Sequence, residues 1–114
     1  MKKKEAVAAN YLENIPKREV LSFSSDDEGI VTLEIENKGI ANKIAQKLLK
    51  KPRISYIHLD KFGSFVWNCI DDEKTIHDIG KDVESEFGEE ANPLYERLAK
   101  FFQILRSYNF ISYK

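Results

Sequence analysis

The sequence IHLDKFGSFVWNCIDDEKTIHDIGKDVESEF, residues 57–87, decides the fold of this chain. Asp60 follows the apolar residues Ile57 and Leu59, and its carboxylate can accept hydrogen bonds from the free backbone N–H groups that begin a helix. The apolar positions after it have the spacing i, i+3, i+4 and i+7 of one helical face: Phe62, Phe65, Val66 and Cys69. Trp67 and Ile70 widen this face, so we expect a helix that is buried on more than one side.

A second helix is predicted directly after the first. Thr75 is suited to cap it, and Asp78 stands at its third position as a shorter form of the usual capping-box glutamate. The apolar stripe continues through four residues: Ile76, Ile79, Val83 and Phe87. Gly88 then predicts the end of the helix.

Alternating residues upstream of this pair of helices predict a small antiparallel sheet. Residues 19–24 and 30–35 alternate in polarity, and the turn sequence Asp26–Gly29 between them is typical of a β-hairpin. A third strand, Ile54–Leu59, turns Ile57 and Leu59 to one side. Its other side carries Ile54, Tyr56 and His58, and we expect this strand at an edge of the sheet.

A third helix is predicted near the C-terminal end. Asn92 is a good cap and Pro93 suits the first helical position. Spacings of 4, 3, 4 and 3 define the seam expected to face the core: Leu94, Leu98, Phe101, Leu105 and Tyr108. A second, narrower apolar shoulder lies beside this seam: Tyr95, Ala99, Phe102 and, at its limit, Arg106. Asn109 predicts the end of the helix, and residues 110–113 form an apolar tail that can make a short strand.

These elements predict an α+β domain with a winged helix-turn-helix-like fold, in which a three-stranded antiparallel sheet precedes three helices. We expect residues 1–17 to form a flexible N-terminal arm with at most a short helix, and residues 18–114 to form one domain. Residues 36–53 are consistent either with a short amphipathic helix or with a basic connector.

The composition is that of a water-soluble globular domain. The 114 residues are 42% hydrophobic and 32% charged, and no apolar run approaches the roughly 20 residues that span a bilayer. The start of the chain lacks the apolar region of a secretory signal. Cys69 is the single cysteine. Since it cannot form an internal disulfide, a reducing, cytoplasmic environment is the simplest interpretation.

Charge is distributed unevenly along the chain. Residues 42–53 carry five basic residues and no acid, whereas residues 60–90 carry ten acids and three lysines. Each block is consistent with an ordinary solvated face. Alternatively, the basic flank and the acidic helical face could orient a charged partner.

The sequence predicts no catalytic residue, metal site or cofactor. It contains no nucleophile elbow, Walker loop or dinucleotide-binding fingerprint. His58 and His77 have no second histidine or cysteine at ligand spacing. Asp71, Asp72 and Glu73 lack the pattern of a calcium loop, so an enzyme is not expected.

The residues quoted above also resemble a known family, that of pyrroloquinoline quinone biosynthesis protein D. The resemblance covers about residues 54–111, half of the chain, and depends most on Leu59-Asp60, Gly63, Trp67 and Thr75. The sequence departs from the family pattern at Asp72, where a glycine is usual, and in the long basic segment at 36–53.

The resemblance implies a non-catalytic domain, also called a RiPP recognition element. Such a domain binds the leader of a ribosomally made precursor peptide and presents it to a modifying enzyme, often a radical S-adenosylmethionine (SAM) protein. In this family the leader adds a strand to the third strand of the sheet and lies against the third helix. Carried to this chain, the strand and the helical shoulder give the expected peptide-binding residues: Arg53, Ile54, Ser55, Tyr56, Ile57, His58, Leu59, Tyr95, Ala99, Phe102 and Arg106.

Several alternatives stay open at this point. Phe102 is equally consistent with a core residue, whereas Tyr95 fits the groove slightly better. Trp67 and Gly63 fit core packing better than ligand contact. Lys50, Lys51 and Arg53 could attract an acidic leader or serve only solubility. An open strand edge can also pair with a second copy of the chain, which leaves a homodimer open. The alternative function is a winged-helix DNA-binding regulator, although the last helix is weakly basic and the preceding one is acidic.

Overall fold

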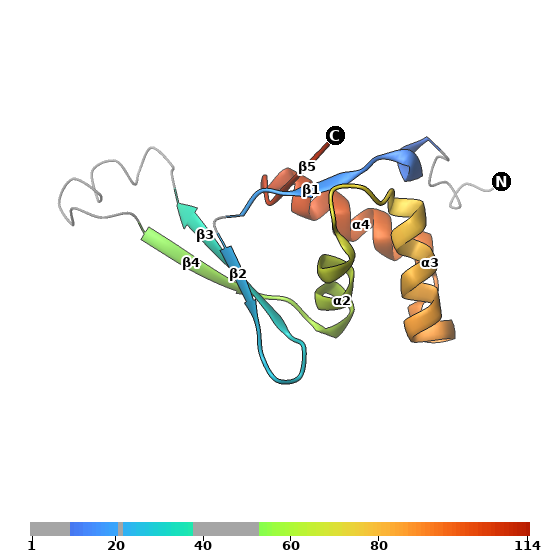
Figure 1. Cartoon of the computed structure of the whole chain (residues 1–114), viewed down its shortest axis with the longest axis horizontal. Helices are drawn as coiled ribbons and strands as arrows, with labels where there is room; N and C mark the ends of the chain where they lie inside the picture. Colours follow the sequence, from blue (N-terminus) through green and yellow to red (C-terminus); the bar gives the residue numbers. More distant parts are fainter. Residues whose placement is uncertain (1–9, 21, 38–52) are drawn as a thin grey trace.

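The computed structural model describes residues 10–20, 22–37 and 53–114, and its main sheet is a three-stranded antiparallel one (Figure 1). The strands are β2 (Ser22–Ser25), β3 (Val31–Asn37) and β4 (Arg53–His58), in the spatial order β2-β3-β4. The predicted hairpin is confirmed. Gly29 adopts a φ of 84°, and the Asp26 carboxylate accepts hydrogen bonds from the backbone N–H groups of Glu28 and Ile30. The first strand begins at Ser22, three residues later than predicted.

The sheet packs its inner face against the first of three helices, α2 (Lys61–Cys69). Val31 and Leu33 of β3 are fully buried, as their alternation predicted. The Asp60 side chain caps α2 by accepting a hydrogen bond from Gly63 N at 2.7 Å. Ser64 Oγ accepts a hydrogen bond of 2.8 Å from Val31 N, so the helix is joined directly to the sheet.

The second helix, α3 (Ile76–Phe87), has the predicted capping box between Thr75 and Asp78, and Gly88 follows it with a φ of 58°. A 3₁₀ turn, η2 (Gly88–Ala91), leads to the long helix α4 (Leu94–Ser107). The predicted cap of α4 is wrong by one residue. Pro93, not Asn92, holds the N-cap position, and no side chain caps this helix.

A second, two-stranded sheet joins the two ends of the described chain. β1 (Pro16–Arg18) pairs antiparallel with β5 (Ile111–Tyr113), and a 3₁₀ turn, η1 (Tyr11–Glu13), precedes β1. The hydroxyl groups of Tyr11 and Tyr113 are 2.8 Å apart and share a hydrogen bond. The sequence did not predict strand β1, and Pro16 within it is buried. Residues 1–9, the rest of the predicted arm, lie outside the described residues.

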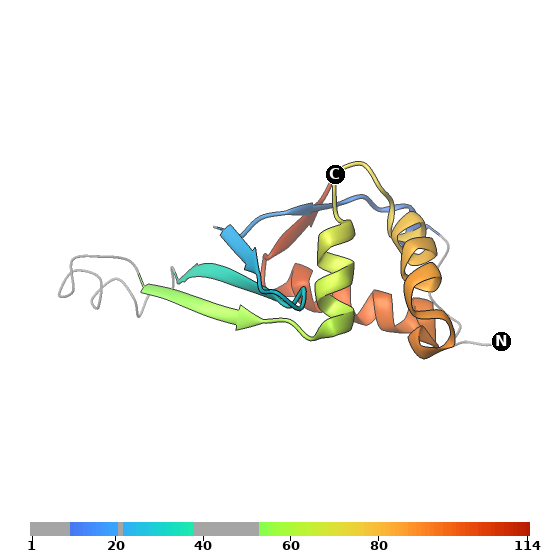
Figure 2. The same cartoon turned by 60° about the horizontal axis from the view of Figure 1, so that its bottom comes forward.

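The helices and the main sheet surround one hydrophobic core, and Figure 2 shows α2 and α3 side by side with α4 passing behind them. Trp67, Phe102 and Leu98 are among its fully buried side chains. The α+β class, the three-stranded antiparallel sheet and the three helices are thus confirmed. The finer winged helix-turn-helix assignment is not established by this arrangement. Most of the segment 36–53, predicted as a helix or connector, lies outside the described residues.

No helix in residues 10–20, 22–37 or 53–114 combines the length and apolar character needed to cross a membrane.

Candidate functional site

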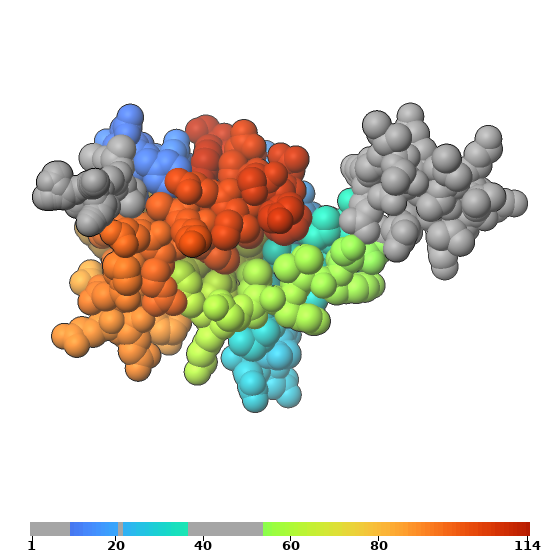
Figure 3. Space-filling view, turned by 180° about the vertical axis from the view of Figure 1, so that it is seen from behind, coloured from blue at the N-terminus to red at the C-terminus, as the bar shows by residue number. Residues whose placement is uncertain are grey.

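An open, largely apolar groove lies between strand β4 and the C-terminal half of helix α4. Its volume is about 610 Å³. Figure 3 shows the surfaces of the two elements side by side, β4 in green and α4 in orange-red. The groove is lined by residues of β3, β4, α4 and the segment after α4: Ile35, Glu36, Ser55, Ile57, Leu59, Phe101, Ile104, Leu105, Tyr108 and Phe110.

Strand β4 forms one wall of the groove and one edge of the main sheet, as predicted. Ser55, Ile57 and Leu59 line the groove. Because side chains alternate along a strand, those of Ile54, Tyr56 and His58 point to the opposite face of the sheet. His58 Nδ1 and Thr32 Oγ1 are 2.7 Å apart and share a hydrogen bond, so this histidine is held on the sheet.

The alternation of hydrogen-bonded and non-hydrogen-bonded residue pairs shows which backbone groups of β4 face its open edge. Leu59 N donates to Val31 O at 2.9 Å. Because hydrogen-bonded and non-hydrogen-bonded pairs alternate along an antiparallel ladder, Ile57, opposite Leu33, also directs its N–H and C=O groups toward β3. The backbone N–H and C=O groups of Ile54, Tyr56 and His58 therefore point away from the sheet. In the part of the chain that the structure describes, no strand pairs with this edge.

Helix α4 forms the other wall with side chains that differ in exposure. Leu105 is 3% exposed, whereas Ile104 is 48% and Tyr108 is 65% exposed. Phe101 is half-buried between the groove and α2, where its ring lies edge-on to Phe62 with centroids 6.5 Å apart. The wall thus consists of a buried residue, Leu105, and two residues accessible to solvent, Ile104 and Tyr108.

The four residues of the predicted helical shoulder do not line this groove. Phe102 is buried in the core with 0% of its surface exposed to solvent, and Ala99 is 7% exposed. Neither residue lines the groove. Tyr95 stacks on His77 of α3, with ring centroids 6.0 Å apart, and therefore lies at the α3–α4 contact. Arg106 is exposed but is not a lining residue. The groove is lined by another face of α4 because the helix buries its Leu98, Phe102 and Leu105 side chains in the core.

The predicted strand residues have a different outcome, because β4 is where the sequence analysis expected it. Ser55, Ile57 and Leu59 lie in the groove, and Ile54, Tyr56 and His58 offer their backbone edge. Arg53 begins β4, but its side chain lies outside the described part of the structure, as do Lys50 and Lys51.

Sequence analysis missed several groove residues that the fold brings together. Ile104 had no assigned role, and Tyr108 and Phe101 were assigned to the core. The spacing 101/104/105/108 follows the same i, i+3, i+4, i+7 rule as a core stripe, so a signal was present. Glu36 and Phe110 are far apart in the sequence, and only the tertiary fold places them on one groove.

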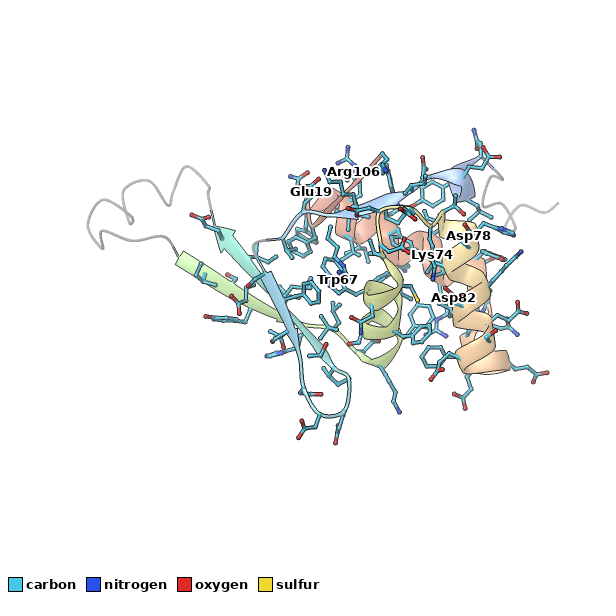
Figure 4. All side chains as sticks on the ribbon, in the orientation of Figure 1. Glu19, Trp67, Lys74, Asp78, Asp82 and Arg106 are labelled. Atoms are coloured by element: carbon cyan, nitrogen blue, oxygen red, sulfur yellow. The ribbon has the colours of Figure 1, made fainter. Side chains whose placement is uncertain are left out.

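The core next to the groove includes Trp67, whose predicted core position is confirmed by its 0% exposure. Its backbone oxygen accepts a hydrogen bond of 2.7 Å from an Arg18 Nη group, and the Arg18 guanidinium lies 4.6 Å from the Phe23 ring centroid. Figure 4 shows Trp67 pointing from α2 toward β2. Trp67 therefore joins the sheet to the helices and does not touch the groove.

The described residues contain no group of three or more His, Cys, Asp or Glu side chains that could hold a metal ion. Burial of the Cys69 side chain raises the pKa of its thiol to about 11, so at neutral pH it is a protonated thiol. The acidic residues of α3 are mostly exposed, and Asp82 pairs with Lys74 at 2.7 Å (Figure 4). The groove itself offers backbone edges and apolar surface, which is the chemistry of binding an extended chain.

Comparison with known proteins supplies the family. No curated protein and no solved structure matches the chain. Residues 31–111 match the family described as "Coenzyme PQQ synthesis protein D (PqqD)", and this range includes β3, β4, all three helices and the start of β5. Because the match covers well over half of the chain, the protein belongs to the PqqD family and has the fold of a RiPP recognition element.

Proposed function

We propose that this protein binds an extended segment of a ribosomally made precursor peptide, its leader, and presents the peptide to a modifying enzyme. Membership of the PqqD family fits a peptide-binding accessory protein of natural-product biosynthesis. In this proposal the protein catalyses no reaction and holds no cofactor. It binds the peptide that the partner enzyme modifies. A radical SAM protein is the enzyme class that the family resemblance suggests.

The single observation that carries this proposal is the position of the groove beside an open strand edge. A peptide strand added to β4 can pair with the outward backbone groups of Ile54, Tyr56 and His58. Since side chains alternate along a strand, every second side chain of such a peptide enters the groove. The apolar surfaces of Ile57, Ile104 and Tyr108 are then covered by the peptide.

The charge of the helices favours a peptide over nucleic acid. Residues 60–90 carry ten acids and three lysines, and the acidic side chains of α3 are exposed. Duplex DNA is repelled by such a face. We therefore do not propose the winged-helix regulator as a second function.

The experiment is a selection followed by mapping. The domain is immobilised and used to select binders from a displayed library of random peptides about 12 residues long, which is enough to cover one strand. A selected peptide is then titrated into the ¹⁵N-labelled protein. We expect amide shifts at residues 54–59 and 101–110, and shifts confined to α3 contradict the proposal.

A homodimer through the same β4 edge competes with the proposed peptide. If the free protein is a dimer by sedimentation velocity and the peptide converts it to a monomer, the two occupy one edge. If the dimer persists with peptide bound at the edge, the dimer contact lies elsewhere.

A further inference from the structure

A segment outside the family match packs beside one end of the groove. Residues 10–20, called here the N-terminal segment, precede the matched residues 31–111, and their strand β1 lies along β5 (Figure 1). Strand β5 begins directly after Phe110, which is a residue of the groove wall. The pairing of β1 with β5 therefore ends next to the groove.

Hydrogen bonds continue from this pairing to the groove wall itself. The last ladder pair is Arg18 with Ile111, and beyond it Glu19 N donates a hydrogen bond of 2.9 Å to Phe110 O. Phe110 N donates in turn to Leu105 O of α4, also at 2.9 Å. Phe110 is therefore held from two sides, through its N–H group by helix α4 and through its C=O group by the N-terminal segment.

Two side chains add to this backbone contact. Glu19 Oε2 accepts a hydrogen bond of 2.6 Å from Ser112 Oγ of β5. Val20 is partly buried against the core and lines a hollow of about 370 Å³ together with Tyr108 and Phe110. Residues 19 and 20 thus border the part of the chain from which the groove takes its aromatic end.

The two aromatic residues at this end form a stacked pair. The ring centroids of Tyr108 and Phe110 are 5.5 Å apart, with an angle of 23° between the ring planes. Tyr108 is 65% exposed, so the protein makes few contacts with its outer side. The position of the Tyr108 ring therefore depends on the Phe110 ring on which it stacks.

We infer that Glu19 and Val20 are positioning residues for peptide binding. The inference rests on the proposed function and extends its site beyond the family match. Neither residue lines the groove; they hold Phe110, and Phe110 with Tyr108 presents the apolar surface that a peptide covers. A wall that is ordered before the peptide arrives loses less conformational entropy on binding, so this support raises affinity without adding a contact.

The test uses two matched pairs of variants. Val20→Ala and Leu12→Ala each shorten a partly buried apolar side chain of the N-terminal segment. Ser112→Ala and Tyr11→Phe each remove one side-chain hydrogen bond between this segment and β5. The first member of each pair acts next to the aromatic end of the groove, and the second acts at the far end of the same segment.

Peptide affinity and stability are measured separately for each variant. The probe is a peptide selected from the random library by the wild type, titrated by fluorescence anisotropy, and urea unfolding gives the stability. We expect Val20→Ala and Ser112→Ala to weaken peptide binding about threefold to fivefold. Leu12→Ala and Tyr11→Phe should lower the urea midpoint and leave the dissociation constant unchanged.

A conservative change at Glu19 provides a rescue. Glu19→Gln keeps a side-chain oxygen that can accept from Ser112 Oγ, so it should bind the peptide as the wild type does. Glu19→Ala removes the acceptor and should weaken binding as Ser112→Ala does. Equal affinities of Glu19→Gln and Glu19→Ala contradict a role for this hydrogen bond.

A measurement on the free protein separates this inference from the proposed function. Nuclear Overhauser effects between the ring protons of Tyr108 and Phe110 report the stacked pair without any peptide. We expect Val20→Ala to weaken them and Leu12→Ala to leave them as in the wild type. Unchanged ring contacts in Val20→Ala mean that Val20 does not hold the pair, and this result overturns the inference.

The affinity data decide the remaining cases. If Val20→Ala binds the selected peptide as tightly as the wild type, the inference fails and the proposed function stands. If Val20→Ala and Leu12→Ala weaken binding equally, the N-terminal segment acts only through stability, and the inference fails again. If the wild type enriches no peptide, the proposed function fails, and the role of residues 19 and 20 in binding fails with it.

Discussion

Gly63 of α2 lies against the ring of Phe101 on α4. A Cβ atom at Gly63 would come within 2.9 Å of Phe101 Cε1, closer than carbon atoms normally approach. Since Phe101 is also a wall of the groove, this glycine sets the position of a groove residue from outside the groove. The predicted role of Gly63 in close helix packing is confirmed, and it has a consequence for the site.

Gly63→Ala should displace the Phe101 ring. The change in free energy of unfolding is expected to be small, because the gain in helix propensity of up to about 1 kcal/mol offsets part of the crowding. Peptide affinity should fall, since the groove wall moves. The Phe101 ring resonances and the anisotropy of a bound peptide measure the two effects. Unchanged affinity together with a shifted ring contradicts the importance of Phe101 for binding.

Phe102→Ala and Ile104→Ala should separate the core from the groove. Phe102 is 0% exposed, and removing its ring should lower the free energy of unfolding by about 3–5 kcal/mol. Ile104 is 48% exposed, so Ile104→Ala should change stability by less than about 1 kcal/mol and weaken peptide binding about fivefold. Urea unfolding and anisotropy give the two numbers. The assignment of Phe102 to the core and Ile104 to the groove is wrong if Ile104→Ala lowers the free energy of unfolding more than Phe102→Ala does.

Tyr56→Pro should remove one outward-facing donor of β4 and leave the sheet intact. Proline is tolerated on the outer side of an edge strand because no ladder hydrogen bond is lost there. Peptide binding should weaken by about 1 kcal/mol, the typical net contribution of one hydrogen bond. Circular dichroism and peptide titration are the measurements.

Two further variants act as controls for this edge. Tyr56→Ala keeps the N–H group and should bind more tightly than Tyr56→Pro. Ile57→Pro removes a bond to β3 and should unfold the sheet. Equal affinity of Tyr56→Ala and Tyr56→Pro argues against strand addition at this edge.

Asp72→Gly should stabilise the domain by about 0.5 kcal/mol. Asp72 has a φ of 68°, the left-handed conformation that glycine adopts without steric cost. A glycine, which the family resemblance implies at this position, would adopt the same turn without strain. Thermal unfolding measures the change. Asp72→Asn removes the charge but still tolerates this conformation, so an equal gain from Asn would assign the effect to charge.

Stability should fall at alkaline pH because of two tyrosines. Burial, followed by the hydrogen bond to Tyr113, raises the pKa of Tyr11, and burial raises the pKa of Tyr113. A raised pKa in the folded state means that the stabilisation is complete below the ordinary tyrosine value of about 10 and is lost above it. Urea midpoints between about pH 9 and pH 11 should show the decline.

Tyr11→Phe should make this decline shallower, since it removes one titrating group. A slope identical to that of the wild type would assign the effect to other groups, of which Cys69, with its thiol pKa raised to about 11, is the first to test.

Local signals in the sequence predicted the parts of the fold that depend on local chemistry. These parts are the two helix caps, Asp60 and Thr75, and the turn before β3. Each depends on a side chain that hydrogen-bonds to nearby backbone, or on a glycine that allows a turn, within a few residues. The edge position of β4 followed from the order of the strands. The β1–β5 pairing could not be predicted, since each strand has three residues and their partners are nearly a hundred residues apart.

The face of α4 that lines the groove differs from the shoulder predicted from the sequence. Two stripes with helical spacing share Leu94, Leu98 and Leu105, and they differ in whether Phe101 or Phe102 completes them. The spacing alone does not choose between them. The choice is made by contacts with α2 and α3, which bury Phe102 and leave Phe101 beside Gly63.

The exposed positions Ile104 and Tyr108 lie one turn apart on a helix whose opposite side is the core. Exchanges at these two positions change what the groove accepts without disturbing the buried stripe that holds the helix. A laboratory library built on these two codons is therefore expected to change the peptide specificity proposed here while the scaffold stays the same.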